Sequence, residues 1–304
     1  MMKANEIRKA GLALTIAFVI TIVLAHPVAA DVNLTAPKYS GIVVDGLADD
    51  WAGVDGIDLT LIRPMASSER LEDGLTLKVA YDDANIYVLA MIHDDYDFNE
   101  TDPHDSGSLA VLFQIDDAAR VDMGGGLGNV DIWHWELETP PGVPAGGPDF
   151  ESGNDPEGNF DDEWAFDVED RHDDTMANEL YGVWSHTGNL SLRGSDGTWI
   201  FEMRRSLTTS DTMDEDAQFS AGGTFGMAIA YWDADQTATG WEHDGHYASC
   251  RDPATLDFSW IQVSLAAAGG GDGALLPAYS GLGLGGIALV IALVSLLRPR
   301  KAAE

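Results

Sequence analysis

One stretch of the chain combines residue types that suit a flat ligand: residues 121–136, VDMGGGLGNVDIWHWE. Met123 precedes a run of glycines, which can adopt positive φ and let the backbone approach a bulky group closely. The next residues alternate as in a strand, so we expect His134 on one face and Trp133 and Trp135 on the other. A thioether beside large aromatic rings suits one axial position of a haem iron. The plain alternative is a tight turn before a core strand, with Met123 filling space.

A second candidate for chemistry is acidic. Residues 139–163 are rich in Pro, Gly, Asp and Asn, which predicts a long irregular loop. Its part NDPEGNFDDE, residues 154–163, offers the oxygen ligands that Ca²⁺ prefers. The spacing matches no EF-hand, so the two interpretations are a Ca²⁺ site and a solvated acidic loop.

The elements that must position these residues are strands. From residue 31 onward, short β-branched and aromatic runs alternate with clusters of Gly, Asp, Asn and Pro, a pattern typical of an all-β sandwich. Helix signals are weak throughout this part. Besides the strand that contains His134, strands are predicted at 41–51, 75–81, 86–93, 109–115, 180–184, 199–204, 224–232 and 258–265.

Composition restricts the possible functions. The chain has 304 residues with 45% hydrophobic content, enough for one large β domain or two small ones. Its net charge is −35, and residues 31–297 alone carry 49 acidic and 10 basic side chains. Such a surface repels nucleic acid and anionic lipid and suits a high-salt habitat, so we expect no nucleic-acid partner. The single cysteine, Cys250, excludes a disulfide framework, a covalently attached haem and an Fe–S cluster.

The two ends predict a location. An apolar run behind a basic start and before a small-residue site is typical of a secretory signal peptide. An uncharged stretch of spanning length, followed by a basic tail, predicts a single transmembrane helix with the main domain outside the membrane. The predicted organisation is a signal peptide (1–30), a β-sandwich domain (31–265), a Gly-rich linker (266–274), a transmembrane helix (275–297) and a cytoplasmic tail (298–304).

Several segments together resemble known families. VDGLADDW, LKVAYDDANIYVLAMIHDD and DSGSLAVLFQID are similar to the first half of family-9 carbohydrate-binding modules and DOMON-like sandwiches. With MGGGLGNVDIWHWE, SDGTWIFEMRRSL and FGMAIAYWDADQTATGWEHDGHYAS added, residues 43–265 resemble the haem-binding gamma subunit of ethylbenzene dehydrogenase and its relatives. Those subunits serve molybdopterin enzymes of the DMSO-reductase type.

The resemblance implies an immunoglobulin-like or DOMON-like sandwich that holds one haem b without a covalent link. The first axial ligand of the family matches Met123. The second is a lysine in the family, but here the matching position is His246, with His134 and His243 as alternatives. Histidine is a well-attested haem ligand, so this replacement is chemically easy.

Three further residues would contact the haem, the arginine because cations are scarce in this acidic domain. Trp133 and Trp135 belong to the haem-binding segment of the family. Arg205, or its neighbour Arg204, would pair with a haem propionate; the alternative is an ion pair with a nearby carboxylate.

The leading hypothesis is therefore a membrane-anchored, extracytoplasmic electron-transfer subunit, with a molybdopterin catalytic subunit and an Fe–S subunit as partners. An enzyme is not expected, because the sequence contains no nucleophile–base set, phosphate loop or zinc motif. The alternative is a cell-surface carbohydrate-binding module without haem, in which some of the nine tryptophans stack on sugars. A structural cell-surface protein is a third possibility.

Overall fold

The computed structural model describes residues 33–63, 71, 74–146, 160–168, 170–175, 179–236, 246–250 and 258–267. The chain divides into two compact units, Met1–Ala268 and Gly269–Glu304, and every described residue belongs to the first. The predicted signal peptide, transmembrane helix and cytoplasmic tail lie outside the described residues, as does most of the predicted linker. Within the described residues, no helix is long and apolar enough to cross a membrane.

The described part is all-β, apart from three short 3-10 turns. The turns are η1 (Asp50–Gly53), η2 (Pro103–Asp105) and η3 (Ala234–Gln236). The strands are β1 (Asn33–Ala36), β2 (Gly56–Ile62), β3 (Leu75–Tyr81), β4 (Asn85–Tyr96), β5 (Ser108–Gln114), β6 (Val130–Trp135), β7 (Ala145–Gly146), β8 (Phe160–Ala165), β9 (Arg171–Asp173), β10 (Tyr181–His186), β11 (Ser195–Ser206), β12 (Thr224–Trp232), β13 (Tyr247–Cys250) and β14 (Ile261–Leu265).

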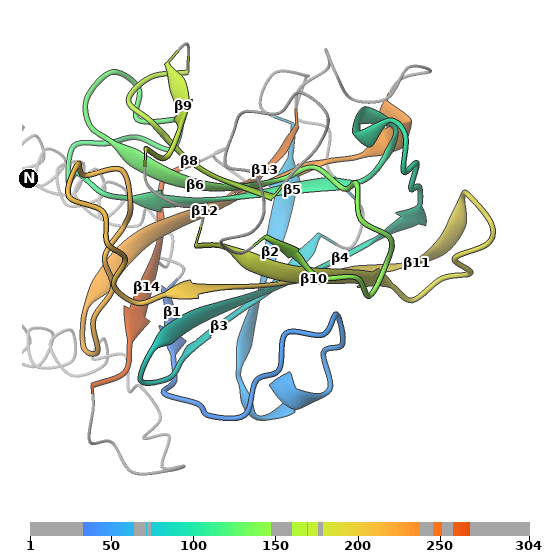
Figure 1. Cartoon of the computed structure of the whole chain (residues 1–304), viewed down its shortest axis with the longest axis horizontal. Helices are drawn as coiled ribbons and strands as arrows, with labels where there is room; N and C mark the ends of the chain where they lie inside the picture. Colours follow the sequence, from blue (N-terminus) through green and yellow to red (C-terminus); the bar gives the residue numbers. More distant parts are fainter. Residues whose placement is uncertain are drawn as a thin grey trace, which may run out of the picture. The chain divides into compact units, whose positions relative to one another are not determined.

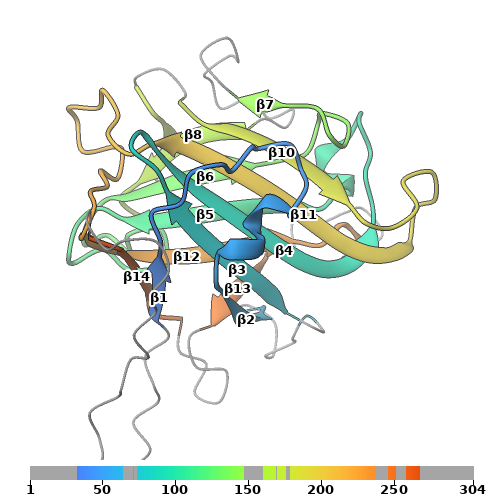
Figure 2. The same cartoon turned by 90° about the horizontal axis from the view of Figure 1, so that it is seen from below.

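These strands form one continuous sheet that curls on itself. Its order is β7-β10-β11-β4-β3-β2-β13-β12-β5-β6-β8-β9, and β14 joins β12 to β1. Figures 1 and 2 show β3, β4, β10 and β11 in one layer and β5, β6, β8 and β12 in the layer opposite. Strand β2 pairs with β3 on one side and with β13 on the other, so it connects the two layers. The all-β prediction is confirmed.

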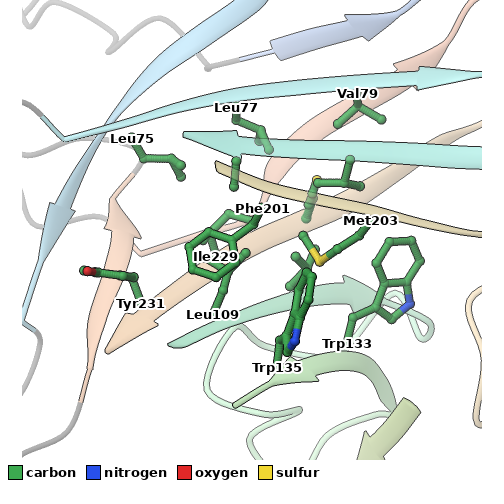
Figure 3. Close-up of a cluster of buried hydrophobic side chains, with 14 of the residues drawn as sticks. Leu75, Leu77, Val79, Leu109, Trp133, Trp135, Phe201, Met203, Ile229 and Tyr231 are labelled. Carbon is green, nitrogen blue, oxygen red and sulfur yellow. The ribbon is translucent and has the colours of Figure 1, made fainter. Parts of the chain in front are cut away.

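The core lies between the two layers, and strands such as β3 and β14 turn alternate apolar side chains toward it. In Figure 3, Leu75, Leu77 and Val79 of β3 face the same interior as side chains of the opposite layer. Aromatic rings fill much of this space; Trp135 stacks on Phe160, with ring centroids 4.4 Å apart. Close packing of rings of this size contributes strongly to stability.

One predicted strand is absent. Residues 41–51 form an irregular segment that ends in η1, and β2 follows it. The backbone N–H groups of Asp45 and Gly46 donate to the buried carboxylate of Glu202, and so does the indole of Trp51. These backbone N–H groups therefore bond to a carboxylate side chain instead of to a neighbouring strand.

The predicted acidic loop ends earlier than expected, because Phe160–Ala165 is strand β8 between β6 and β9. Asp161, Asp162 and Glu163 are buried in it. Composition predicted a solvated segment, but these carboxylates lie beside cationic side chains of other strands.

One such partner is Arg205 of β11, which is completely buried and meets three aspartates. Its Nη2 donates to Asp131 of β6 at 2.6 Å, and its Nη1 donates to Asp162 of β8 at 3.0 Å and to Asp216. Nη2 also donates to the carbonyl of Ala217 at 2.9 Å. The cluster ties β11 of one layer to β6 and β8 of the other.

Removing this cation should destabilise the protein strongly. We expect Arg205→Ala to lower the free energy of unfolding by about 3–5 kcal/mol, because it leaves three buried carboxylates without their partner. Arg204→Ala is the matched control: that guanidinium lies over the Tyr181 ring at 4.6 Å, and its loss should cost about 1 kcal/mol or less. Chemical denaturation measures the free energy of unfolding of both variants. Equal losses in the two variants would contradict the role assigned to Arg205.

A second polar link joins the layers at Asp94 of β4. The Tyr231 hydroxyl on β12 donates to its Oδ2 at 2.8 Å. Burial, together with the nearby Asp233, raises the pKa of Asp94 to about 7. Burial likewise raises the pKa of Asp131 to about 6, although Arg205 opposes the shift.

These raised pKa values predict that stability falls as pH rises. The folded state holds protons that the unfolded chain has released above about pH 4, so this contribution disappears as pH passes through 6 to 7. We expect a lower Tm at about pH 8 than at about pH 5.5, a window in which ordinary carboxylates stay ionised. Asp94→Asn should shrink the difference, whereas Asp196→Asn, at an exposed position, should not. A Tm that rises across this window would refute the argument.

Candidate functional site

Three of the predicted site residues lie in the core. Trp133 and Trp135 are fully buried between the layers, and Trp133 packs on Phe113 with ring centroids 4.7 Å apart. Figure 3 shows both indoles among the apolar side chains of the interior. Arg205 lies 5.3 Å from the Trp133 ring and is held by aspartates. In the structure, the two tryptophans therefore pack in the core and Arg205 forms buried ion pairs.

Met123 lies in the turn between β5 and β6, half-buried against an apolar cluster that includes Ala119 and Val130. The glycines after it serve close backbone packing. A Cβ on Gly124, whose φ is +89°, would lie 2.4 Å from the carbonyl oxygen of Phe166. This arrangement agrees with the plain alternative of a tight turn before a core strand.

The outward face of β6 carries the other candidate. His134 points away from Trp133 and Trp135, as the alternation predicted. Its ring centroid lies 5.5 Å from that of Trp232 on β12. On the same indole, the His246 ring lies at 5.0 Å. The structure therefore brings together two of the predicted histidines around a half-buried tryptophan, and we call these three residues the imidazole–indole site. His243 lies outside the described residues.

Carboxylates surround His134. Its Nε2 lies 3.6 Å from Glu136 Oε1, and its Nδ1 lies 3.6 Å from Glu163 Oε1. Arg171 approaches the second oxygen of Glu163 at 3.3 Å, and Asp161 is the direct cross-strand neighbour of His134. Among the described residues, His134 Nε2 and Asp161 Oδ1 are buried without a hydrogen-bond partner. Buried polar atoms usually have hydrogen-bond partners, so these two atoms are candidates for contact with a ligand.

Charge differs sharply across the site. Burial lowers the pKa of His246 to about 4, so this imidazole is neutral at neutral pH. Burial also acts to lower the pKa of His134, but the Glu163 carboxylate outweighs it and the pKa is raised. Burial and Glu163 raise the pKa of Asp161 to about 7. The site thus offers an aromatic face, a neutral imidazole and groups that donate and accept hydrogen bonds.

The predicted ligand pair is not brought together. Met123 lies in the turn at the Val130 end of β6, and His134 is four residues along, about 13 Å at strand spacing. Trp232 pairs with Ser108 at the start of β5, so His246 also lies at the far end. Two axial ligands must face each other across a single iron, and the described positions of Met123 and His246 do not provide this.

Sequence reasoning missed the contribution of Trp232. The alternation in FGMAIAYW puts this residue on the same face as Ala228 and Ala230, opposite the core residues Met227 and Tyr231. A large aromatic ring beside small residues on a non-core face was the available signal. Glu136 could have been found by its spacing of two from His134, which places both side chains on one side of the chain.

Comparisons with known proteins give the following findings. No family model matches the chain. No curated protein matches it either. Similar solved structures include a family-9 carbohydrate-binding module from Caldicellulosiruptor kristjanssonii in complex with glucose, at 14% identity and a TM-score of 0.43, covering 80% of this chain and 98% of that one. The cellotriose complex of such a module gives 17% identity, 81% and 98% coverage and a TM-score of 0.42.

A putative carbohydrate-binding protein from Bacteroides uniformis is also similar, at 11% identity and a TM-score of 0.44, with 78% and 100% coverage. These findings correct the predicted resemblance: the similar structures are carbohydrate-binding proteins, not haem-binding gamma subunits. The haem, cytochrome b and electron-transfer assignment is wrong with it.

Proposed function

We propose that this chain is a carbohydrate-binding protein built on an immunoglobulin-like β-sandwich, and that the imidazole–indole site contacts the sugar. The observation that supports this is the half-buried indole of Trp232, which has the ring centroids of two imidazoles at 5.0 and 5.5 Å and lies near buried polar atoms that lack partners among the described residues.

A sugar ring matches this combination of groups. The C–H groups on one face of a pyranose pack against an aromatic ring, while its hydroxyls exchange hydrogen bonds with carboxylates and imidazoles. Ligand sites commonly combine an apolar platform with a few convergent polar groups. Trp232 supplies the platform, the neutral His246 can donate or accept, and Glu136 supplies an acceptor.

Charge narrows the class of sugar. The carboxylates near His134 and the net charge of −35 create a negative potential that repels uronic-acid and sulfated polysaccharides. We therefore propose a neutral glycan as ligand. We also propose secretion and membrane anchoring, as the sequence predicts. Both would place the site where extracellular glycans occur.

Titration of the full-length chain with neutral oligosaccharides tests the function. We expect cellotriose or a related neutral glycan to bind, and Trp232→Ala to weaken binding about tenfold or more, because the aromatic platform is lost. Isothermal titration calorimetry measures the affinity.

Trp164→Ala is the matched control, since Trp164 is a half-buried indole that contacts His172 on β9 and is no part of the site. The affinity of Trp164→Ala for the glycan should equal that of the wild type. Failure of the wild type to bind any neutral glycan on an array, or full affinity of Trp232→Ala, would exclude this function.

A further inference from the structure

Three asparagines occur in the sequence pattern Asn-x-Ser/Thr, which carbohydrate binding does not use. They are Asn33, Asn99 and Asn189, followed two positions later by Thr35, Thr101 and Ser191. In an exported protein this pattern is an acceptor for an N-linked glycan, which needs a place on the surface because it is bulky. The pattern also occurs without modification, so the surroundings of each asparagine decide which of them can serve.

The first two asparagines are poorly placed for glycan transfer. Asn99 is half-buried: its Nδ2 donates to Asp105 Oδ2 at 3.3 Å, and its Oδ1 accepts from the Thr101 hydroxyl at 2.9 Å. The amide nitrogen and the hydroxyl of the pattern are therefore already bonded. Asn33 is exposed but begins β1, whose backbone pairs with β14. Entry of this segment into the cleft of a transfer enzyme would break its hydrogen bonds to β14.

Asn189 has the opposite surroundings. It is exposed, in the hairpin that joins β10 to β11, and Figure 1 shows this hairpin projecting beyond the neighbouring strands. Its Oδ1 accepts the backbone N–H of Ser191 at 3.1 Å, which forms an Asx turn and holds the exposed Ser191 close to the carboxamide. Among the described residues, its Nδ2 has no acceptor. Asn189 thus presents a free amide nitrogen beside a hydroxyl on a projecting turn.

The same hairpin carries apolar surface that a glycan would cover. Leu190 is 44% exposed and Leu192 is 59% exposed, although the chain is strongly acidic. Both leucines are close neighbours of Asn189 in the hairpin. The C–H groups of a sugar pack against apolar side chains, and an attached glycan makes a protein surface more soluble.

We propose that Asn189 is an N-glycosylation site and that Asn33 and Asn99 are not modified in the folded chain. In the transfer, Nδ2 of Asn189 loses a proton and bonds to C1 of an oligosaccharide carried on a lipid diphosphate. The bond from C1 to the phosphate oxygen breaks, and the lipid diphosphate leaves with the electron pair. Glycosylation in the cell rests on the proposed secretion, and it is independent of sugar binding at the imidazole–indole site.

Mass spectrometry of the full-length chain, isolated from secreting cells that contain an oligosaccharyltransferase, tests the site. We expect one glycan on the intact protein and, in its peptides, on Asn189. Asn189→Gln and Ser191→Ala should each remove the glycan mass completely, because the acceptor nitrogen or the hydroxyl of the pattern is lost. Ser191→Thr restores the hydroxyl and should keep the glycan. Asn99→Gln is the matched control and should also keep it.

A second experiment separates the choice of site from export. The folded, glycan-free chain is treated with a purified oligosaccharyltransferase and a lipid-linked oligosaccharide, and we expect modification at Asn189 alone. Short peptides that contain Asn33 or Asn99 should be modified too, because the fold no longer restrains them. Protease treatment of intact cells shows separately whether the chain is exported. An exported chain without a glycan on Asn189, no transfer to Asn189 in the purified reaction, or transfer to folded Asn99 would overturn the proposal.

Discussion

The buried guanidinium of Arg205 is the interaction on which the two-layer arrangement depends. It extends from β11 in one layer and bonds to Asp131 and Asp162 on β6 and β8 in the other. A charge buried this deeply is tolerated only when its partners are present and well placed. The aspartates in turn are tolerated inside because Arg205 is there. The cluster therefore favours one pairing of the layers over alternatives that leave a charge alone.

The same cluster determines which face of β6 carries His134 and the imidazole–indole site. Side chains alternate along a strand, so placing Asp131 inward also places Trp133 and Trp135 inward and His134 outward. A slip of one residue would bury His134 in the apolar core and expose both indoles. The buried ion pair of Arg205 and Asp131 thus fixes the His134 imidazole on the opposite face of β6, where it meets Trp232 from β12.

The glycines and tryptophans of residues 121–136 are residue types that can serve either core packing or the binding of a flat ligand. Gly124 allows its turn to approach the backbone of Phe166, and Trp135 stacks on Phe160 in the interior. Close approach and aromatic stacking are also what a flat cofactor needs, so the pattern alone did not separate a ligand site from core packing. The side chains that face outward, not those in the glycine-rich turn, make the candidate site.

The sequence by itself determined the all-β class, the strand 75–81 and the two faces of β6, because alternation of apolar and polar residues is local information. It did not determine that Phe160–Ala165 is a strand, because acidic residues usually remain in water. Asp162 is buried only because Arg205, 43 positions away, meets it. Likewise, His134 and His246 share one indole only after β6, β5, β12 and β13 align in the sheet. Contacts between distant segments arise from tertiary packing, and no local pattern records them.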